Sequence, residues 1–195
     1  MLILKKVAVT GGFASGKTTV CQMFKKFGAF VVDSDAIVHQ LLSLDTAIGK
    51  QVVELLGKEI ITGNQIDRKK IAKIVFSDPH KLKALEVILH PAVQKSIAAS
   101  FDKILDLPQY SFFVAEVPLL FEAKMEDDFD LVIAVRTSAP VAKARLKEHQ
   151  EFDRRMARQL SDKTEKADFI IDNDGDLKTL EKQIKTIIPE LKESP

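Results

Sequence analysis

The stretch Gly11-Gly12-Phe13-Ala14-Ser15-Gly16-Lys17-Thr18 carries residues whose types and spacing point to phosphate chemistry. It fits the pattern G-x-x-x-x-G-K-[ST], in which glycines allow backbone turns and successive N–H groups face phosphate oxygens. In that pattern Lys17 reaches the β- and γ-phosphates of a nucleotide, and the Thr18 hydroxyl binds Mg²⁺. An ordinary strand-to-helix turn is the alternative. The apolar run Val7–Val9 before the loop and the helix-like stretch Thr19–Phe24 after it favour the phosphate loop.

Two carboxylates follow the next apolar run. Ala29–Val32 has the unbroken apolar character of a parallel strand that is covered on both faces, and Asp33 and Asp35 come directly after it. Ligands bind at the carboxyl ends of such strands, so we expect Asp33 to lie beside the phosphate loop. There it would take the proton of an acceptor hydroxyl or help to hold Mg²⁺. Asp35 fits a helix cap as well as a role in the site.

A segment rich in arginine lies late in the chain and contains Arg136, Arg145, Arg154, Arg155 and Arg158. Acidic residues stand between them, and mixed charge of this kind is typical of a solvated helix. The alternative is a mobile lid whose arginines close on a triphosphate and stabilise the group in transfer. The sequence leaves both interpretations open.

Three further polar residues stand in apolar surroundings. Glu116 interrupts the run Ser111–Val117, where a carboxylate is costly unless it is paired, so we expect it to face the nucleotide end of the sheet. Glu122 fits a solvated loop equally well. His90 precedes Pro91 and is either a core or surface residue or a substrate contact. The four histidines are scattered without the spacing of zinc ligands, which argues against a zinc site.

The composition sets the class of protein. The chain has 195 residues, a net charge of +1 and a single cysteine, Cys21, which excludes an internal disulfide framework. The stretch Met1–Lys6 indicates a first strand and not a signal peptide, and no apolar run approaches the ~20 residues of a membrane span. We therefore expect a cytoplasmic protein. The balanced charge favours neither a membrane nor a nucleic-acid partner.

Strands alternating with helices predict an α/β fold with a parallel sheet. The expected strands are Val7–Thr10, Ala29–Val32, Ser111–Val117, Leu131–Val135 and Phe169–Ile171. The mostly helical block 35–100 is too long for a simple crossover and predicts an inserted substrate-binding part. Within it, Asp67 is expected to cap a helix, and Pro91 to end or kink one. The stretch Ile60–Ile66, with Gly63-Asn64 inside it, is expected to form a tight turn or a small hairpin.

The chain resembles the dephospho-CoA kinases along nearly its whole length. The matching stretches are Thr10–Gly12, Ser15–Val20, Val31–Asp35, Asp67-Arg68, Val75-Phe76, Leu85-Glu86, Leu89–Pro91, Val117–Glu122, Arg155 with Gln159, Ala167-Asp168 and Ile171–Gly175. The resemblance implies ATP-dependent phosphorylation of the ribose 3′-hydroxyl of dephospho-CoA, the last step of coenzyme A synthesis, with ATP as co-substrate and Mg²⁺ as cofactor. It implies a P-loop NTPase core with a parallel five-stranded sheet flanked by helices, in a monomer or weak homo-oligomer.

The resemblance also assigns segments and residues. The core would comprise 1–34, 110–140 and 167–195, the helical CoA-binding insertion 35–109, and the lid 141–166. The implied catalytic residues are Asp33, Lys17, Arg145 and Arg155. The implied ATP contacts are Gly12, Ala14, Ser15, Gly16, Lys17, Thr18 and Thr19, with Thr18 on Mg²⁺. The implied substrate contacts are Asp35, His90, Pro118 and Leu119. The chain departs from the family in the lid, where His149 replaces an arginine and the segment between Gln159 and Ala167 is short.

Three other classes of protein are alternatives to this one. A nucleoside or sugar kinase on the same core is a close rival, and the His-Pro and Pro-Leu-Leu-Phe-Glu elements favour dephospho-CoA over it. A guanine-nucleotide switch would need an Asn-Lys-x-Asp element, which the chain lacks. A nucleic-acid binder would need a basic surface interleaved with aromatic residues, and the balanced charge argues against one.

Overall fold

A computed structural model describes residues 4–145 and 165–193. The chain divides into two compact units. The sheet unit comprises Met1–Asp33 and Ser100–Pro195, and the helical unit comprises Ser34–Ala99.

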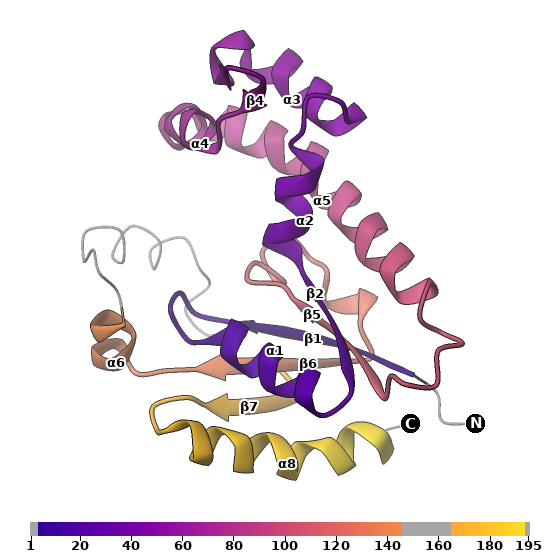
Figure 1. Cartoon of the computed structure of the whole chain (residues 1–195). Coiled ribbons are helices and arrows are strands. Elements are labelled where there is room, and N and C mark those ends of the chain that lie inside the picture. The colour runs from indigo at the N-terminus through magenta and orange to yellow at the C-terminus, as the bar shows by residue number, and fades with distance from the viewer. Residues whose placement is uncertain (1–3, 146–164, 194–195) are drawn as a thin grey trace. The chain divides into compact units, whose positions relative to one another are not determined.

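The sheet unit is built on a parallel sheet, which has five strands over the described residues in the order β2-β5-β1-β6-β7 (Figure 1). The strands are β1 (Lys5–Gly11), β2 (Ala29–Asp33), β5 (Phe112–Glu116), β6 (Leu131–Arg136) and β7 (Phe169–Asp172). The central strand β1 pairs with β5 on one side and β6 on the other, and it is buried from Val7 to Gly11. The predicted five-stranded parallel α/β sheet is therefore confirmed.

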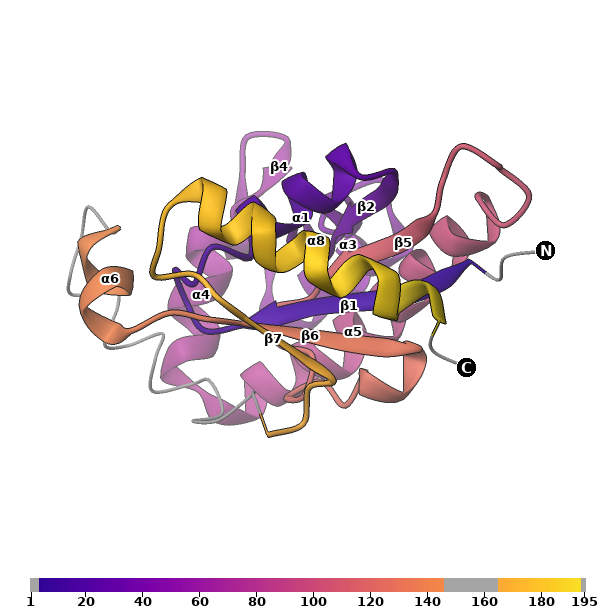
Figure 2. The same cartoon turned by 90° about the horizontal axis from the view of Figure 1, so that it is seen from below.

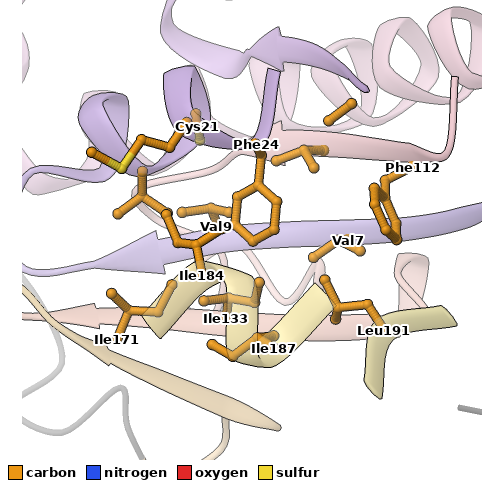
Figure 3. Close-up of a cluster of buried hydrophobic side chains, with 14 of the residues drawn as sticks. Val7, Val9, Cys21, Phe24, Phe112, Ile133, Ile171, Ile184, Ile187 and Leu191 are labelled. Atoms are coloured by element: carbon orange, nitrogen blue, oxygen red, sulfur yellow. The ribbon is translucent and has the colours of Figure 1, made fainter. Parts of the chain in front are cut away.

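Two helices cover one face of this sheet, namely α1 (Lys17–Lys26) and α8 (Leu177–Glu193), which lie next to each other (Figure 2). Their apolar residues meet those of the strands in one core cluster, in which Phe24 of α1 and Ile184 of α8 face Val9 and Ile133 (Figure 3). All four side chains are fully buried. Among the described residues, this unit also contains the short helix α6 (Ala139–Ala144) and the 3₁₀ turn η2 (Glu126–Asp128).

The helical unit has its own core. Its elements are α2 (Ser34–Leu41), α3 (Ala47–Leu56), the 3₁₀ turn η1 (Lys58–Ile60), β3 (Ile61–Thr62), β4 (Gln65–Ile66), α4 (Arg68–Ser77) and α5 (Pro79–Asp102). Strands β3 and β4 form the predicted small hairpin. Asp67 caps α4 as predicted, because its Oδ1 accepts the backbone N–H groups of Lys69 (2.9 Å) and Lys70 (3.4 Å). Leu42, Val52, Ile60, Ile71 and Leu85 are among the residues that fill the core.

Pro91 does not end its helix, contrary to one of the two outcomes that the sequence predicted. Helix α5 continues through Pro91 to Asp102. A proline removes the N–H that would bond the carbonyl four residues earlier, here that of Val87. Pro91 is exposed and the Val87 side chain is 64% exposed, so water can replace the lost hydrogen bond on this side of the helix. Over residues 4–145 and 165–193, no helix has both the length and the apolar composition that a membrane crossing requires.

Candidate active site

The parallel order brings five chain segments to one edge of the sheet. Each strand ends there and is followed by a polar group: the phosphate loop after β1, Asp33 at the end of β2, and Glu116 at the end of β5. Thr137 follows β6, and Asn173 follows β7. Because ligands of such sheets bind at the carboxyl ends of the strands, this edge is the candidate site.

The phosphate loop joins β1 to α1 with backbone angles that favour glycine. Gly11 has φ +146° and Gly16 has φ +89°, and Ala14 adopts φ +58°. A Cβ on Gly11 would lie 2.3 Å from the carbonyl oxygen of Val135, so only glycine lets β1 end this close to β6. Left-handed residues next to right-handed ones turn successive N–H groups to the same side, which makes an anion-binding concavity. The strand, glycine loop and helix predicted from the sequence are confirmed.

Lys17, at the start of α1, folds back under the loop. Its Nζ donates to the carbonyl oxygens of Gly11 (3.2 Å) and Gly12 (2.9 Å), and the residue is only 8% exposed. The ammonium group is thus held at the loop by neutral acceptors. Its flexible four-carbon stem allows the ammonium group to exchange these acceptors for others.

The hydroxyl groups of the loop are also suited to a site for a phosphate and its metal counter-ion. Ser15 is buried, and its Oγ has no hydrogen-bond partner among the described residues. Thr18 Oγ1 donates to Oε1 of Glu116 at 2.9 Å. Glu116 is 7% exposed and pairs in register with Val9 of β1 and Asp33 of β2, so it lies at the nucleotide edge as the sequence indicated. A hydroxyl and a carboxylate side by side are oxygen ligands of the kind that Mg²⁺ takes.

The charged groups at this edge of the sheet shift the pKa of one buried thiol, that of Cys21. Burial raises the pKa of Cys21 well above its ordinary value, and the negative charges of Glu116 and then Asp33 raise it further, while Lys17 opposes them. Glu116, Asp33 and Lys17 therefore all lie near enough to Cys21, in α1, to influence its pKa. Asp33 itself is exposed at the end of β2. Its part in proton transfer stays a prediction.

Arg145 is the one predicted lid arginine among the described residues, and it lies at the phosphate loop. Its Nη1 donates to the carbonyl oxygen of Ser15 (3.3 Å) and to Thr137 Oγ1 (3.4 Å), and its Nη2 donates to the carbonyl oxygen of Asn173 (2.6 Å). Thr137 and Asn173 were given no individual role from the sequence. The rule that singled out Asp33, a polar residue after a parallel strand, would have found both.

The other predicted residues are placed as follows. Pro118 follows β5, and its carbonyl oxygen accepts from Thr10 Oγ1 at 3.4 Å. Leu119 is 46% exposed. Asp35, in the first turn of α2, and His90, in α5, belong to the helical unit, and burial lowers the pKa of His90. Arg154, Arg155, Arg158, His149 and Gln159 lie outside the described residues. The predicted roles of all these side chains stay predictions.

Fold and site together define a P-loop phosphotransferase of the nucleotide-dependent kinase class. The family model for dephospho-CoA kinase matches residues 5–179 of the chain. A dephospho-CoA kinase of Protochlamydia amoebophila is 43% identical over an alignment that covers 98% of each chain. A solved dephospho-CoA kinase from Campylobacter jejuni superposes with a TM-score of 0.69 and 27% identity over 96% of each chain. A Thermus thermophilus protein reaches 0.82 with 28% identity over 97% of this chain and 98% of its own. The chain belongs to the dephospho-CoA kinase family.

Proposed function

We propose that this protein transfers the γ-phosphoryl group of ATP to the ribose 3′-hydroxyl of dephospho-CoA, giving coenzyme A and ADP in the final step of coenzyme A biosynthesis. The observation that carries the proposal is the family match over residues 5–179, which includes the phosphate loop and the segments after it. A phosphate loop alone would suit many nucleotide-dependent enzymes.

The loop supplies most of the catalytic effect in this proposal. Its inward N–H groups bind the phosphates, helped by the positive end of α1. Lys17 moves from the carbonyl oxygens of Gly11 and Gly12 to the β- and γ-phosphates and neutralises charge that builds up as the phosphoryl group leaves. Asp33 accepts the proton of the ribose 3′-hydroxyl, whose oxygen then bonds to the γ-phosphorus. The bond from that phosphorus to the β–γ bridging oxygen breaks, and ADP is released.

The proposal includes Mg²⁺, which would neutralise phosphate charge as the phosphoryl group is transferred. Thr18 Oγ1 is the protein ligand that the sequence predicted, and its contact with Glu116 supports the fit. Glu116 would orient the Thr18 hydroxyl, because a carboxylate that accepts its hydrogen leaves the oxygen lone pairs free for the cation.

The remaining roles follow from the family resemblance. Arg145 would stabilise the transferring group, and its present contact with the loop carbonyl at Ser15 supports a place beside ATP. Arg155 would act with it from the lid segment 141–166. Asp35, His90, Pro118 and Leu119 would bind dephospho-CoA, the first two from the insertion 35–109.

Location and assembly remain proposals of the same kind. We place the enzyme in the cytoplasm, as a monomer or weak homo-oligomer, with ATP and dephospho-CoA as its partners and no nucleic acid. The segments 1–34, 110–140 and 167–195 would form the nucleotide-binding core.

A coupled ADP-release assay tests the proposed reaction. ATP and Mg²⁺ are supplied with dephospho-CoA, adenosine, gluconate or shikimate in parallel reactions. Dephospho-CoA should give the highest kcat/KM, with coenzyme A and ADP formed in equal amounts by mass spectrometry. Faster phosphorylation of adenosine or of a sugar acid would show that the acceptor is wrongly assigned, while the kinase class would stand.

A further inference from the structure

Three side chains donate to one backbone carbonyl of the phosphate loop. The carbonyl oxygen of Ser15 accepts Asn173 Nδ2 at 2.7 Å, Thr137 Oγ1 at 3.0 Å and Arg145 Nη1 at 3.3 Å. A carbonyl oxygen has two lone pairs, so the three donors share them and the nearest donor holds the group most strongly. The shortest of the three bonds comes from Asn173, which is only 6% exposed.

Asn173 is itself held in place by its backbone. Its N–H donates to the carbonyl oxygen of Arg136 at 2.8 Å, and its own carbonyl oxygen accepts Arg145 Nη2 at 2.6 Å. Its side-chain amide also packs directly over the loop, because a Cβ on Gly16 would lie 2.1 Å from Asn173 Nδ2. The amide is therefore a fixed point against which the loop rests.

Fixing the Ser15 carbonyl also fixes the N–H of Gly16. The two groups belong to one planar trans peptide, in which the C=O and N–H bonds point in opposite directions. A carbonyl directed at Asn173 therefore sends the Gly16 N–H to the other side of the peptide plane. In a phosphate loop the N–H groups before the helix are the phosphate donors.

We propose that Asn173 is a positioning residue for the phosphates of ATP, because its side-chain amide holds the Ser15–Gly16 peptide with its N–H directed into the loop. The inference rests on the proposed function in one respect, that the loop binds the phosphates of a nucleotide. It explains why a buried amide at the end of β7 contacts a loop 158 positions earlier in the chain.

Binding measurements on the full chain test this role. The affinities of ATP and inorganic tripolyphosphate are measured by calorimetry for the wild type, Asn173→Ala and Asn173→Asp. Asn173→Ala should weaken both ligands by the same factor, about tenfold for the loss of one hydrogen bond in a loop that keeps two other donors. Asn173→Asp keeps the packing over Gly16 but sets an oxygen against the Ser15 carbonyl, so its loss should be larger. Dephospho-CoA affinity should stay within about twofold in both variants.

The matched control is Asp174→Ala. Asp174 Oδ1 accepts the backbone N–H of Ser138 at 2.8 Å, so it ties down the same connection without reaching the phosphate loop. This variant should bind tripolyphosphate like the wild type. If Asp174→Ala loses as much tripolyphosphate affinity as Asn173→Ala, the inference is overturned, because Asn173 then only maintains the structure of the loop after β7. Wild-type tripolyphosphate affinity together with weakened ATP binding would overturn the inference in favour of a contact with the base.

These measurements distinguish a failure of the inference from misfolding of the variant and from a failure of the proposed reaction. If Asn173→Ala fails to fold by circular dichroism, the isosteric Asn173→Asp decides alone, and wild-type tripolyphosphate affinity in it would overturn the inference. No acceptor is present in these measurements. Asn173-dependent binding in a protein that does not phosphorylate dephospho-CoA would therefore support the inference and refute only the acceptor.

Discussion

Replacement of Thr18 by valine isolates one hydroxyl at the centre of the site. Valine has nearly the shape and the β-branching of threonine, so it keeps the side-chain volume in the first turn of α1 and replaces only the hydroxyl with a methyl group. That oxygen donates to Oε1 of Glu116 at 2.9 Å, and Glu116 is 7% exposed. The substitution thus takes a donor from a buried carboxylate and, in the proposed reaction, a ligand from Mg²⁺.

The size of the effect follows from the type of bond that is lost. A hydrogen bond to a charged group is worth about 1.5–3 kcal/mol, and since Thr18 is exposed we expect a loss of unfolding free energy near the lower limit. In a chain of this length that lowers Tm by roughly 3–6 °C. If the transition state loses the same 1.5–3 kcal/mol of stabilisation, kcat/KM falls by about 10- to 150-fold. Thr18→Ser keeps the hydroxyl and is the matched control.

Two measurements check this prediction: the ADP-release rate over a series of Mg²⁺ concentrations, and a thermal melt without ligand. Thr18→Val should need more Mg²⁺ for half-maximal rate, and Thr18→Ser should stay near the wild type in both measurements. Wild-type kcat/KM and Mg²⁺ dependence in Thr18→Val would refute the proposed role of the hydroxyl. A serine variant as impaired as the valine variant would attribute the effect to packing of the methyl group.

The remaining predictions concern the charged groups. Lys17→Ala should nearly abolish turnover while circular dichroism stays unchanged, because the ammonium group neutralises phosphate charge; a near wild-type rate would contradict the phosphate-loop assignment. Asp33→Asn should lower kcat at least about 10²-fold, the low end for a lost general base, and Asp35→Asn should lower it less; the opposite order would assign the general base to Asp35. Burial lowers the pKa of His90 below its ordinary 6.5, so the unfolded chain binds the proton first as pH falls. The His90 contribution is therefore complete above pH 6.5 and is lost as pH falls toward the lower folded pKa. His90→Asn should flatten the decline of Tm in that window, and an unchanged pH profile would show that other groups cause it.

Features that depend on residues close together in the sequence were predictable from the sequence alone. The glycine spacing and the flanking strand and helix patterns identified the phosphate loop, since left-handed backbone at Gly16 and close approach at Gly11 both need glycine. The cap at Asp67 was predictable for the same reason, because its bonds reach only two and three positions along the chain. The rule that parallel strands present ligands at their carboxyl ends placed Asp33 at the edge of the sheet, and it applied equally to Asn173.

Contacts between loops that lie far apart in the sequence were decided only by the tertiary structure. Local patterns gave the strands but not their order, and the order places β6 between β1 and β7. That order brings Thr137 and Asn173 to the Ser15 carbonyl across 122 and 158 positions. The continuation of α5 through Pro91 was likewise beyond the sequence, because a proline shows which hydrogen bond is lost but not whether water can replace it. Spacing along a chain determines which groups can turn or cap locally, whereas the convergence of donors on one carbonyl depends on which strands become neighbours.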